Sequence, residues 1–409
     1  MSNAEKVLTN DLEIGMHVTG LDRPWLETPF VLQGFVIKTN QDIDRLRQYC
    51  RYVYVQKALE KGTIEYKPSN SHNRPRQSRQ QLFVDRKLTD YVDDANWQEE
   101  YPRAKQAVAE LSDGIDSIFD NVTRGGALEI VKIKQAVQPM IDSITRNPDA
   151  CIWLARMKQE DNYTYQHSLG ASIWAVALGR QLGLPKQDLR SLAIGGLLFD
   201  VGKLKVPREL LSAERELSPD EFELVKKHVD LGLESVKESG VMNQDVIDMV
   251  AHHHERHDGS GYPNGLKADD IPVFARIAAI VDCYDAITSH RSYARAIPPS
   301  LAIKKLYERK DIDYQAELVE EFIQAIGIYP AGTLVELSSG EVAVVVAEYR
   351  SRRLRPRVLV LLDNNKAPLK EMKMIDLLTE TESDEGERLE IISSLEPEAY
   401  GIDMAGIQL

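Results

Sequence analysis

The chain has 409 residues, 43% of them hydrophobic, and a formal net charge of −14 at pH 7. Its length exceeds what one compact core usually supports, so we expect two or three domains, one with a sizeable helical core. The negative charge argues against extended nucleic acid as a partner, because phosphate backbones attract basic surfaces. A small anion held in a local metal pocket is still compatible with this charge.

Cysteine usage and hydropathy indicate the compartment. The three cysteines, Cys50, Cys151 and Cys283, form no closely spaced even framework, which is typical of a reducing environment. No apolar run approaches the roughly 20 residues that a membrane-spanning helix needs, and no basic region followed by an apolar core opens the chain. We therefore expect a cytoplasmic protein without disulfides and without a membrane span.

Short β-type runs characterise the first part of the chain. Residues 29–32 and 35–37 are apolar, and a helical stretch near residues 42–49 precedes the strand signal Tyr52-Val53-Tyr54-Val55. These patterns predict a small α+β domain over residues 1–66.

The next segment is polar and then becomes helical. Residues 67–80 contain proline and lack apolar anchors, which predicts a linker over residues 67–100. From Ala104 two apolar stripes recur at helical spacing. They predict a helical hairpin over residues 101–150, joined near Gly125-Gly126.

Residues 151–328 are expected to be mostly helical. One helix start is marked by an N-cap serine, a proline and a capping-box glutamate at Ser218, Pro219 and Glu221. The expected fold class is therefore mainly α, with small domains of other types at the two ends.

The last part changes to strand patterns. Runs at residues 333–337, 342–349 and 358–362 predict a small β appendage over residues 329–378. Residues 379–409 carry much acidic charge, which predicts a solvated, flexible tail.

Histidines are concentrated in the helical part. Seven of the nine lie between His167 and His290, under a third of the chain. Helical spacing places an inward-facing polar set on otherwise apolar faces: His167, Asp200, His253, His254 and Asp282. A single such histidine is usually a hydrogen-bonded core residue. A buried set of imidazoles and carboxylates needs a shared cation, and mixed nitrogen and oxygen ligands suit iron, manganese, nickel or zinc.

A glycine-rich turn follows the paired histidines. Three glycines in the stretch from Asp258 to Gly265 allow the backbone to approach a ligand, and Pro263 stiffens the turn. Alone, such a turn is more often a plain loop. Beside a metal cluster it is a candidate substrate wall, which includes Asp258, Gly259, Gly261, Tyr262 and Pro263.

These motifs resemble the HD-GYP family, a subgroup of the HD metal-dependent phosphohydrolases. The stretch His-His-Glu-Arg-His-Asp-Gly-Ser-Gly-Tyr-Pro at residues 253–263 is close to the long family signature. Other family blocks are similar at residues 163–168, 203–207 and 275–282, in the expected order. The first 66 residues look like the small domain of unknown function that often precedes this domain.

The resemblance implies an all-helical domain that hydrolyses cyclic di-GMP, or a related cyclic dinucleotide, to pGpG, GMP or both. It also implies two divalent metals, with Asp200 as the bridging ligand. By position, the other ligands are His167 and Asp282 for one metal, and His228, His253 and His254 for the other. Phosphate contacts would come from Lys203, Arg291 and Arg295. Members of the family contact diguanylate cyclase (GGDEF) domains, and a homodimer is compatible with the resemblance.

One family ligand is missing. Phe199 stands where the family has the histidine of its HD pair, and a phenyl ring cannot bind metal. His167, Asp200 and Asp282 could still form a three-ligand site completed by water. The leading hypothesis is thus a weakened phosphodiesterase. The alternative is a catalytically degenerate domain that acts as a cyclic di-GMP sensor or signalling interaction protein.

Overall fold

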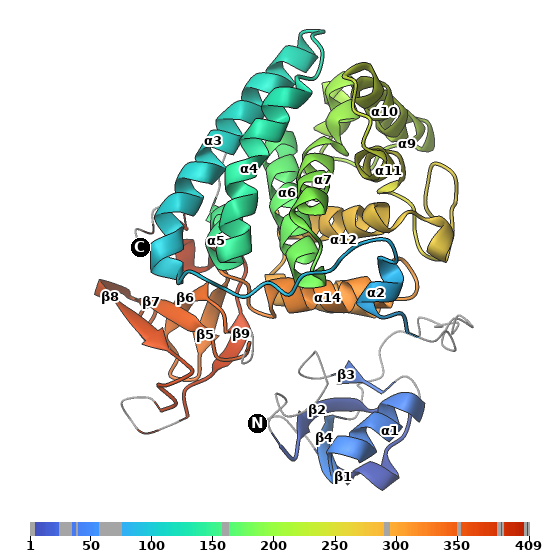
Figure 1. The fold of residues 1–409 in the computed structure, drawn as a ribbon. Coiled ribbons are helices and arrows are strands. Elements are labelled where there is room, and N and C mark those ends of the chain that lie inside the picture. The colour runs from blue at the N-terminus through green and yellow to red at the C-terminus, as the bar shows by residue number, and fades with distance from the viewer. Residues whose placement is uncertain are drawn as a thin grey trace. The chain divides into compact units, whose positions relative to one another are not determined.

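The computed structural model of the chain describes residues 5–23, 35–37, 40–56, 76–157, 163–289, 295–349, 353–382, 386, 388–404 and 407. The chain divides into two compact units, Met1–Asn70 and Ser71–Leu409 (Figure 1). Each unit is described by itself. Among the described residues, no helix is long and apolar enough to cross a membrane.

The first unit is a small α+β domain, as predicted. Its antiparallel sheet has the strand order β1-β4-β2-β3. The strands and helices are β1 (Glu5–Leu8), the 3₁₀ helix η1 (Thr9–Asp11), β2 (His17–Leu21), β3 (Phe35–Val36), α1 (Asn40–Tyr49) and β4 (Tyr52–Gln56). Ile43 and Leu46 of α1 share a buried core with Val53 and Val55 of β4. The alternation of apolar and exposed positions in β4 produces this one-sided core. The predicted β run at residues 29–32 lies outside the described residues.

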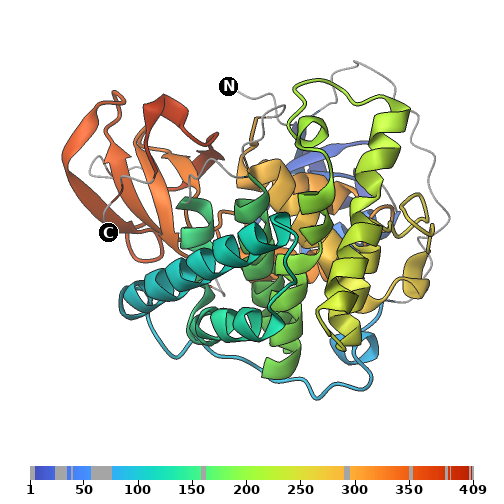
Figure 2. The ribbon, with the colours of Figure 1, turned by 90° about the horizontal axis from the view of Figure 1, so that it is seen from above.

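Two long helices occupy the range expected to form a helical hairpin. They are α3 (Trp97–Thr123) and α4 (Ile130–Arg146), and α5 (Pro148–Met157) follows them. Both views show α3 and α4 side by side (Figures 1 and 2). A capping box between Asn96 and Glu99 starts α3. Gly125 has a φ of +86°, which favours glycine at the turn after α3.

The remaining helices form the body that carries the candidate site. They are α6 (Tyr163–Leu182), α7 (Lys186–Leu198), α8 (Arg208–Leu211), α9 (Pro219–Lys226), α10 (His228–Glu238), α11 (Gln244–His252), α12 (Val273–Thr288), α13 (Pro299–Glu308) and α14 (Ala316–Ile326), with the 3₁₀ helix η4 (Val201–Lys205) after α7. The capping box of Ser218 and Glu221 starts α9 as predicted. Small residues let the helices approach closely, since a Cβ at Gly196 of α7 would lie 2.8 Å from the Ser172 Cα of α6. The fold class predicted from the sequence is confirmed.

A five-stranded antiparallel sheet follows the helical body. Its strand order is β8-β7-β6-β5-β9. The strands are β5 (Leu334–Leu337), β6 (Val342–Ala347), β7 (Arg357–Leu362), β8 (Pro368–Asp376) and β9 (Ile391–Ser394). The last strand lies in the segment expected to be a flexible tail, where β9 pairs with β5 and Leu389 is buried in the sheet core. The acidic residues around this short apolar run led to the prediction of a flexible tail in place of a strand.

The described part of the expected linker also differs from a solvated spacer. Residues 76–96 include the short helix α2 (Arg79–Leu82), capped by Ser78. Phe83 is buried and meets the Phe274 ring edge-on at 6.4 Å. Arg79 and Arg86 form ion pairs with acidic side chains of the helical body. One buried aromatic ring and two ion pairs therefore hold this polar segment against the helical body.

Candidate metal centre

Five elements of the helical body bring the predicted ligands together. His167 lies on α6, and Asp200 follows α7. His228 opens α10, His253 and His254 follow α11, and Asp282 lies on α12. All are buried except His254, which is partly exposed. Residues separated by more than a hundred positions thus meet in one buried polar cluster.

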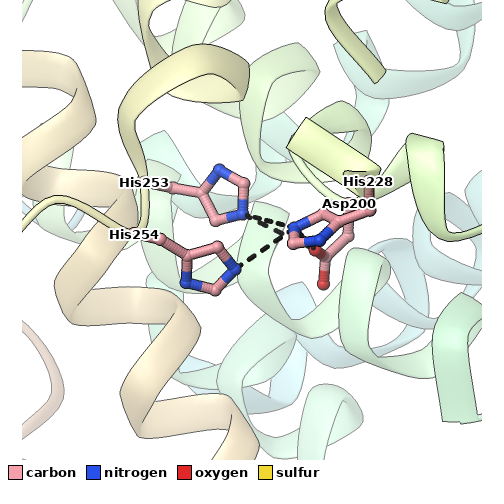
Figure 3. Close-up of side chains that lie close together, drawn as sticks. All are labelled: Asp200, His228, His253 and His254. Atoms are coloured by element: carbon pink, nitrogen blue, oxygen red, sulfur yellow. Dashed lines mark hydrogen bonds and ion pairs between the residues drawn. The ribbon is translucent and has the colours of Figure 1, made fainter. Parts of the chain in front are cut away.

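The first ligand group consists of Asp200, His228, His253 and His254 (Figure 3). The Nε2 atom of His228 lies 3.4 Å from His253 Nε2 and 3.2 Å from His254 Nε2. Asp200 Oδ1 lies 3.3 Å from His228 Nε2 and 3.6 Å from His253 Nε2. One carboxylate oxygen and three ring nitrogens therefore point at a common centre.

The other ring nitrogens show which atoms are free to bind a cation. His228 Nδ1 lies 2.7 Å from the Val225 carbonyl oxygen, and His253 Nδ1 lies 3.1 Å from that of Val250. Each Nδ1 donates to a carbonyl, so in the neutral rings each Nε2 carries a lone pair. These two lone pairs face each other and also face the Asp200 carboxylate. All three groups repel one another unless a cation lies between them. The residues present therefore fit a metal ion.

The second ligand group consists of His167, Asp200 and Asp282. His167 Nε2 lies 3.1 Å from Asp282 Oδ1 and 3.4 Å from Asp200 Oδ2. His167 Nδ1 lies 2.8 Å from Asp285 Oδ2, and Asp285 Oδ1 accepts a hydrogen bond of 2.9 Å from Trp174 Nε1. Asp285 thus directs the Nε2 lone pair of His167 at two carboxylates, an arrangement that a cation would stabilise.

Burial and nearby charges favour the metal-binding protonation states of His228, His254 and Asp200. Burial lowers the pKa of His228 to about 4 and that of His254 well below its usual value. Burial alone would raise the pKa of Asp200, but Lys203 and the adjacent imidazoles lower it well below its usual value. At neutral pH His228 and His254 are therefore neutral imidazoles and Asp200 is a carboxylate, the forms that bind metal.

Gly202 allows the two halves of the centre to approach. A Cβ at this position would lie 1.9 Å from the His228 carbonyl oxygen and 2.5 Å from Gly232 N. No side chain fits there, so η4 packs directly on the first turn of α10. This close packing places Asp200 beside His228.

Phe199 lies inside the centre and is fully buried. Its ring stacks on His253 at 4.8 Å and meets His167 edge-on at 5.7 Å. The phenyl ring therefore packs against one imidazole of each ligand group but offers no ligand atom.

Lys203 contacts the cluster directly. Its Nζ donates a 2.5 Å hydrogen bond to Asp200 Oδ2. The ammonium therefore supplies a positive charge next to the carboxylate that links both ligand groups. It is also partly exposed, with 20% of its side chain accessible, so it can reach a ligand that enters from solvent.

The glycine-rich turn borders the centre through one residue. Tyr262 stacks on the His254 ring at 4.6 Å. Buried Glu255 fixes this turn by accepting hydrogen bonds from Asn264 N at 2.8 Å and Leu266 N at 3.0 Å. A Cβ at Gly261 would lie 2.4 Å from His254 O, so glycine is required for the close approach.

The other predicted substrate residues differ in position. Exposed Asp258 accepts a hydrogen bond from Ser260 N within the turn, which is a local structural role. Gly259 has a φ of +83°, and Pro263 is exposed. Arg295 is exposed, and Arg291 lies outside the described residues.

Two residues of the centre are missing from the sequence-based prediction. Asp285 follows Asp282 by one helical turn, and this spacing places both carboxylates on one face of α12. Glu255 directly follows His254, and its burial is not visible in the sequence. The helical spacing could have identified Asp285, whereas no pattern indicates the bonds of Glu255.

Asp285→Asn is expected to weaken metal binding by about 10- to 100-fold, because the amide can present a donor to His167 Nδ1 and favour the wrong tautomer. Titration of the metal against a competing chelator measures this change. Asp230→Asn makes the same substitution at an exposed position of α10 and should leave the affinity unchanged. Equal affinities of the Asp285→Asn variant and the unaltered protein would contradict this role.

Family comparisons match all three parts of the chain. Residues 140–318 match the family model described as HD domain. Residues 5–133 match a domain of unknown function, DUF3391, and residues 334–383 match a KOW domain associated with HD domain.

One curated relative covers most of the chain, and others cover about two-fifths of it. A cyclic di-GMP phosphodiesterase of Pseudomonas aeruginosa is 31% identical over 384 residues, which cover 91% of this chain and 89% of the relative. A cyclic di-GMP phosphodiesterase of Thermotoga maritima is 30% identical over 168 residues, 40% of this chain and 45% of the relative. A 3'3'-cGAMP-specific phosphodiesterase of Vibrio cholerae is 32% identical over 162 residues, 39% of this chain and 31% of the relative.

The fold and the buried His/Asp cluster define an HD-type phosphohydrolase domain with a site for divalent metal. Within that class, the chain belongs to the HD-GYP family.

Proposed function

We propose that the protein is a metal-dependent phosphodiesterase that hydrolyses cyclic di-GMP to pGpG, GMP or both. The observation that carries the proposal is the position of Asp200, whose two carboxylate oxygens face the two ligand groups separately. The name of the relative that aligns with 91% of the chain supports the choice of substrate. The proposed reaction class is therefore hydrolysis of a phosphodiester.

Two metals are proposed at this centre. His167 and Asp282 would hold one and His228, His253 and His254 the other, with Asp200 shared. Nitrogen and oxygen ligands of this kind suit iron, manganese, nickel or zinc. Bound metal would polarise a phosphoryl oxygen and make water more acidic.

The chain's own residues would bind and orient the substrate. Lys203, already at the edge of the cluster, would contact a phosphate oxygen as a point charge. Asp285 would hold the ring of His167, and Glu255 would hold the turn that carries Tyr262. Arg295, which is exposed, is proposed as a further phosphate contact.

Turnover of cyclic di-GMP tests the proposal. Metal-free protein is loaded separately with iron, manganese, nickel or zinc and incubated with the nucleotide, and the products are separated by ion-exchange chromatography. Linear pGpG or GMP is expected with at least one metal. Product formation no faster than by Asp200→Ala, with every metal, would overturn it. Parallel reactions with 3'3'-cGAMP measure the nucleotide preference.

The second candidate function is a cyclic di-GMP sensor without hydrolysis. Phe199 favours it, because a fully buried phenyl ring packs against one imidazole of each ligand group without offering a ligand atom. Calorimetry distinguishes the two functions: a sensor binds the nucleotide and releases no product. Contacts with diguanylate cyclase domains are a further proposal within this second function, tested by co-purification of the two proteins with and without cyclic di-GMP.

A further inference from the structure

A row of three aromatic rings runs outward from the candidate metal centre. The ring of His254 stacks on Tyr262 at 4.6 Å with an interplanar angle of 27°. Tyr262 meets Phe222 of α9 edge-on at 6.3 Å. His254 and Tyr262 are half-buried, whereas Phe222 at the outer end of the row is 45% exposed. Metal binding by the proposed ligands does not require an exposed aromatic ring such as Phe222 at the outer end of the row.

A cation accompanies the outer two rings. Lys226, one helical turn after Phe222, has its Nζ 5.1 Å from the Phe222 ring centre and 5.4 Å from that of Tyr262. Its ion pair with Glu223 joins a partly exposed lysine to an exposed glutamate and contributes little energy. The ammonium can therefore exchange this partner for a ligand at low cost.

We infer that Phe222 and Lys226 form the base-binding wall of the substrate site. A phosphate at the metal centre leaves the attached nucleoside to extend outward, and the row of rings provides an apolar surface in that direction. A purine would stack on Phe222, because any base has an aromatic face. Lys226 would donate to O6 or N7 of guanine, the acceptors that lysine binds in nucleic acids. This inference rests on the proposed function and deepens it.

The wall would favour guanine over adenine. Guanine presents two adjacent acceptors, O6 and N7, whereas adenine presents an amino donor beside its N7. An ammonium has donors only, so it matches guanine better. Stacking on Phe222 does not discriminate, since it accepts both purines. The two residues thus have separable roles. Phe222 contributes to the affinity for either purine, and Lys226 determines the preference for guanine.

Substitution of Phe222 tests the stacking role. Phe222→Ala is expected to raise the KM for cyclic di-GMP about tenfold, because one base loses its stacking partner. The kcat should change less than about twofold, since the stack is present in ground state and transition state alike. Phe222→Trp should retain the affinity. Leu224→Ala removes a side chain of similar exposure, 44%, from the same helix and should have no effect.

A purely structural role of Phe222 gives a different pattern. Phe222→Leu keeps apolar bulk beside Tyr262 but has no aromatic face, so packing alone predicts that it behaves like the unaltered protein. Stacking predicts a raised KM for Phe222→Leu and a normal one for Phe222→Trp. This pair decides the question even if Phe222→Ala fails to fold, which its melting temperature reveals. Equal KM values for the leucine and tryptophan variants would overturn the stacking role.

Substitution of Lys226 tests the base preference. Lys226→Met keeps the length of the side chain and removes its charge. It should weaken binding of cyclic di-GMP about tenfold and leave cyclic di-AMP nearly unaffected, so that the preference between them falls. An equal loss of affinity for cyclic di-GMP and cyclic di-AMP would overturn the proposed contact between Lys226 and guanine.

Calorimetry separates failure of this inference from failure of the proposed function. If the unaltered, metal-loaded protein binds cyclic di-GMP without hydrolysis, phosphodiesterase activity is excluded. The Kd values of the same variants then still test the wall. If it hydrolyses the nucleotide and the affinity of Phe222→Ala equals that of Leu224→Ala, only the wall is wrong. Absence of any nucleotide binding would overturn both.

Discussion

Asp200→Asn is expected to abolish hydrolysis to the limit of detection and to remove at least one bound metal per chain. Asp200 is the only carboxylate that belongs to both ligand groups of the described residues. Loss of a residue that merely supports a ligand costs about 10- to 100-fold in metal affinity or activity, and loss of a shared ligand must cost at least that much. Elemental analysis after desalting measures the metal, and product chromatography measures the rate.

Lys203→Met is the matched control, because it removes the other half of the Asp200–Lys203 ion pair. Without the ammonium, Asp200 Oδ2 has one competitor fewer for a metal, so metal content should be retained. Turnover should fall, since the proposed phosphate contact is lost. If Lys203→Met loses as much metal as Asp200→Asn, the ion pair and not the carboxylate ligand maintains the centre.

Phe199→His is expected to produce the largest gain in metal affinity and in the rate of hydrolysis. The new imidazole would lie beside His167 and His253, one from each ligand group. We expect tighter binding of the metal at His167, Asp200 and Asp282, with hydrolysis increased about tenfold or more. Without metal the variant should be less stable by about 1–3 kcal/mol, because a buried polar ring replaces an apolar one. Unfolding experiments with and without a chelator, together with metal analysis, measure these changes.

Phe199→Leu separates the ligand effect from the packing effect. Leucine is apolar and has no ligand atom, so this variant should be destabilised without any gain in metal affinity or hydrolysis. Equal rates for the unaltered protein and Phe199→His would mean that the missing histidine is dispensable. Hydrolysis by Phe199→His alone would mean that the natural chain is catalytically degenerate.

The family and the fold class could be predicted from the sequence because both depend on local patterns. Apolar residues at helical spacing predicted the helical body, and the signature around His253 and His254 indicated the family. The six predicted ligands lie together in the structure, and their metal-binding role stays a prediction. The inward direction of five of them followed from the helical period, since each shares a face with apolar residues. His228 was assigned through the family resemblance alone.

Only the tertiary structure decided what surrounds the ligands. Asp285 orients His167, and Glu255 holds the turn beside His254, through hydrogen bonds between residues on different elements or across a turn. Phe222 meets Tyr262 because α9 and the glycine-rich turn come together in space. Strand β9 joins the sheet of the β appendage by pairing with β5, across more than 50 residues of chain. Helical and strand periods determine which face a side chain occupies, but a contact partner depends on how distant elements pack.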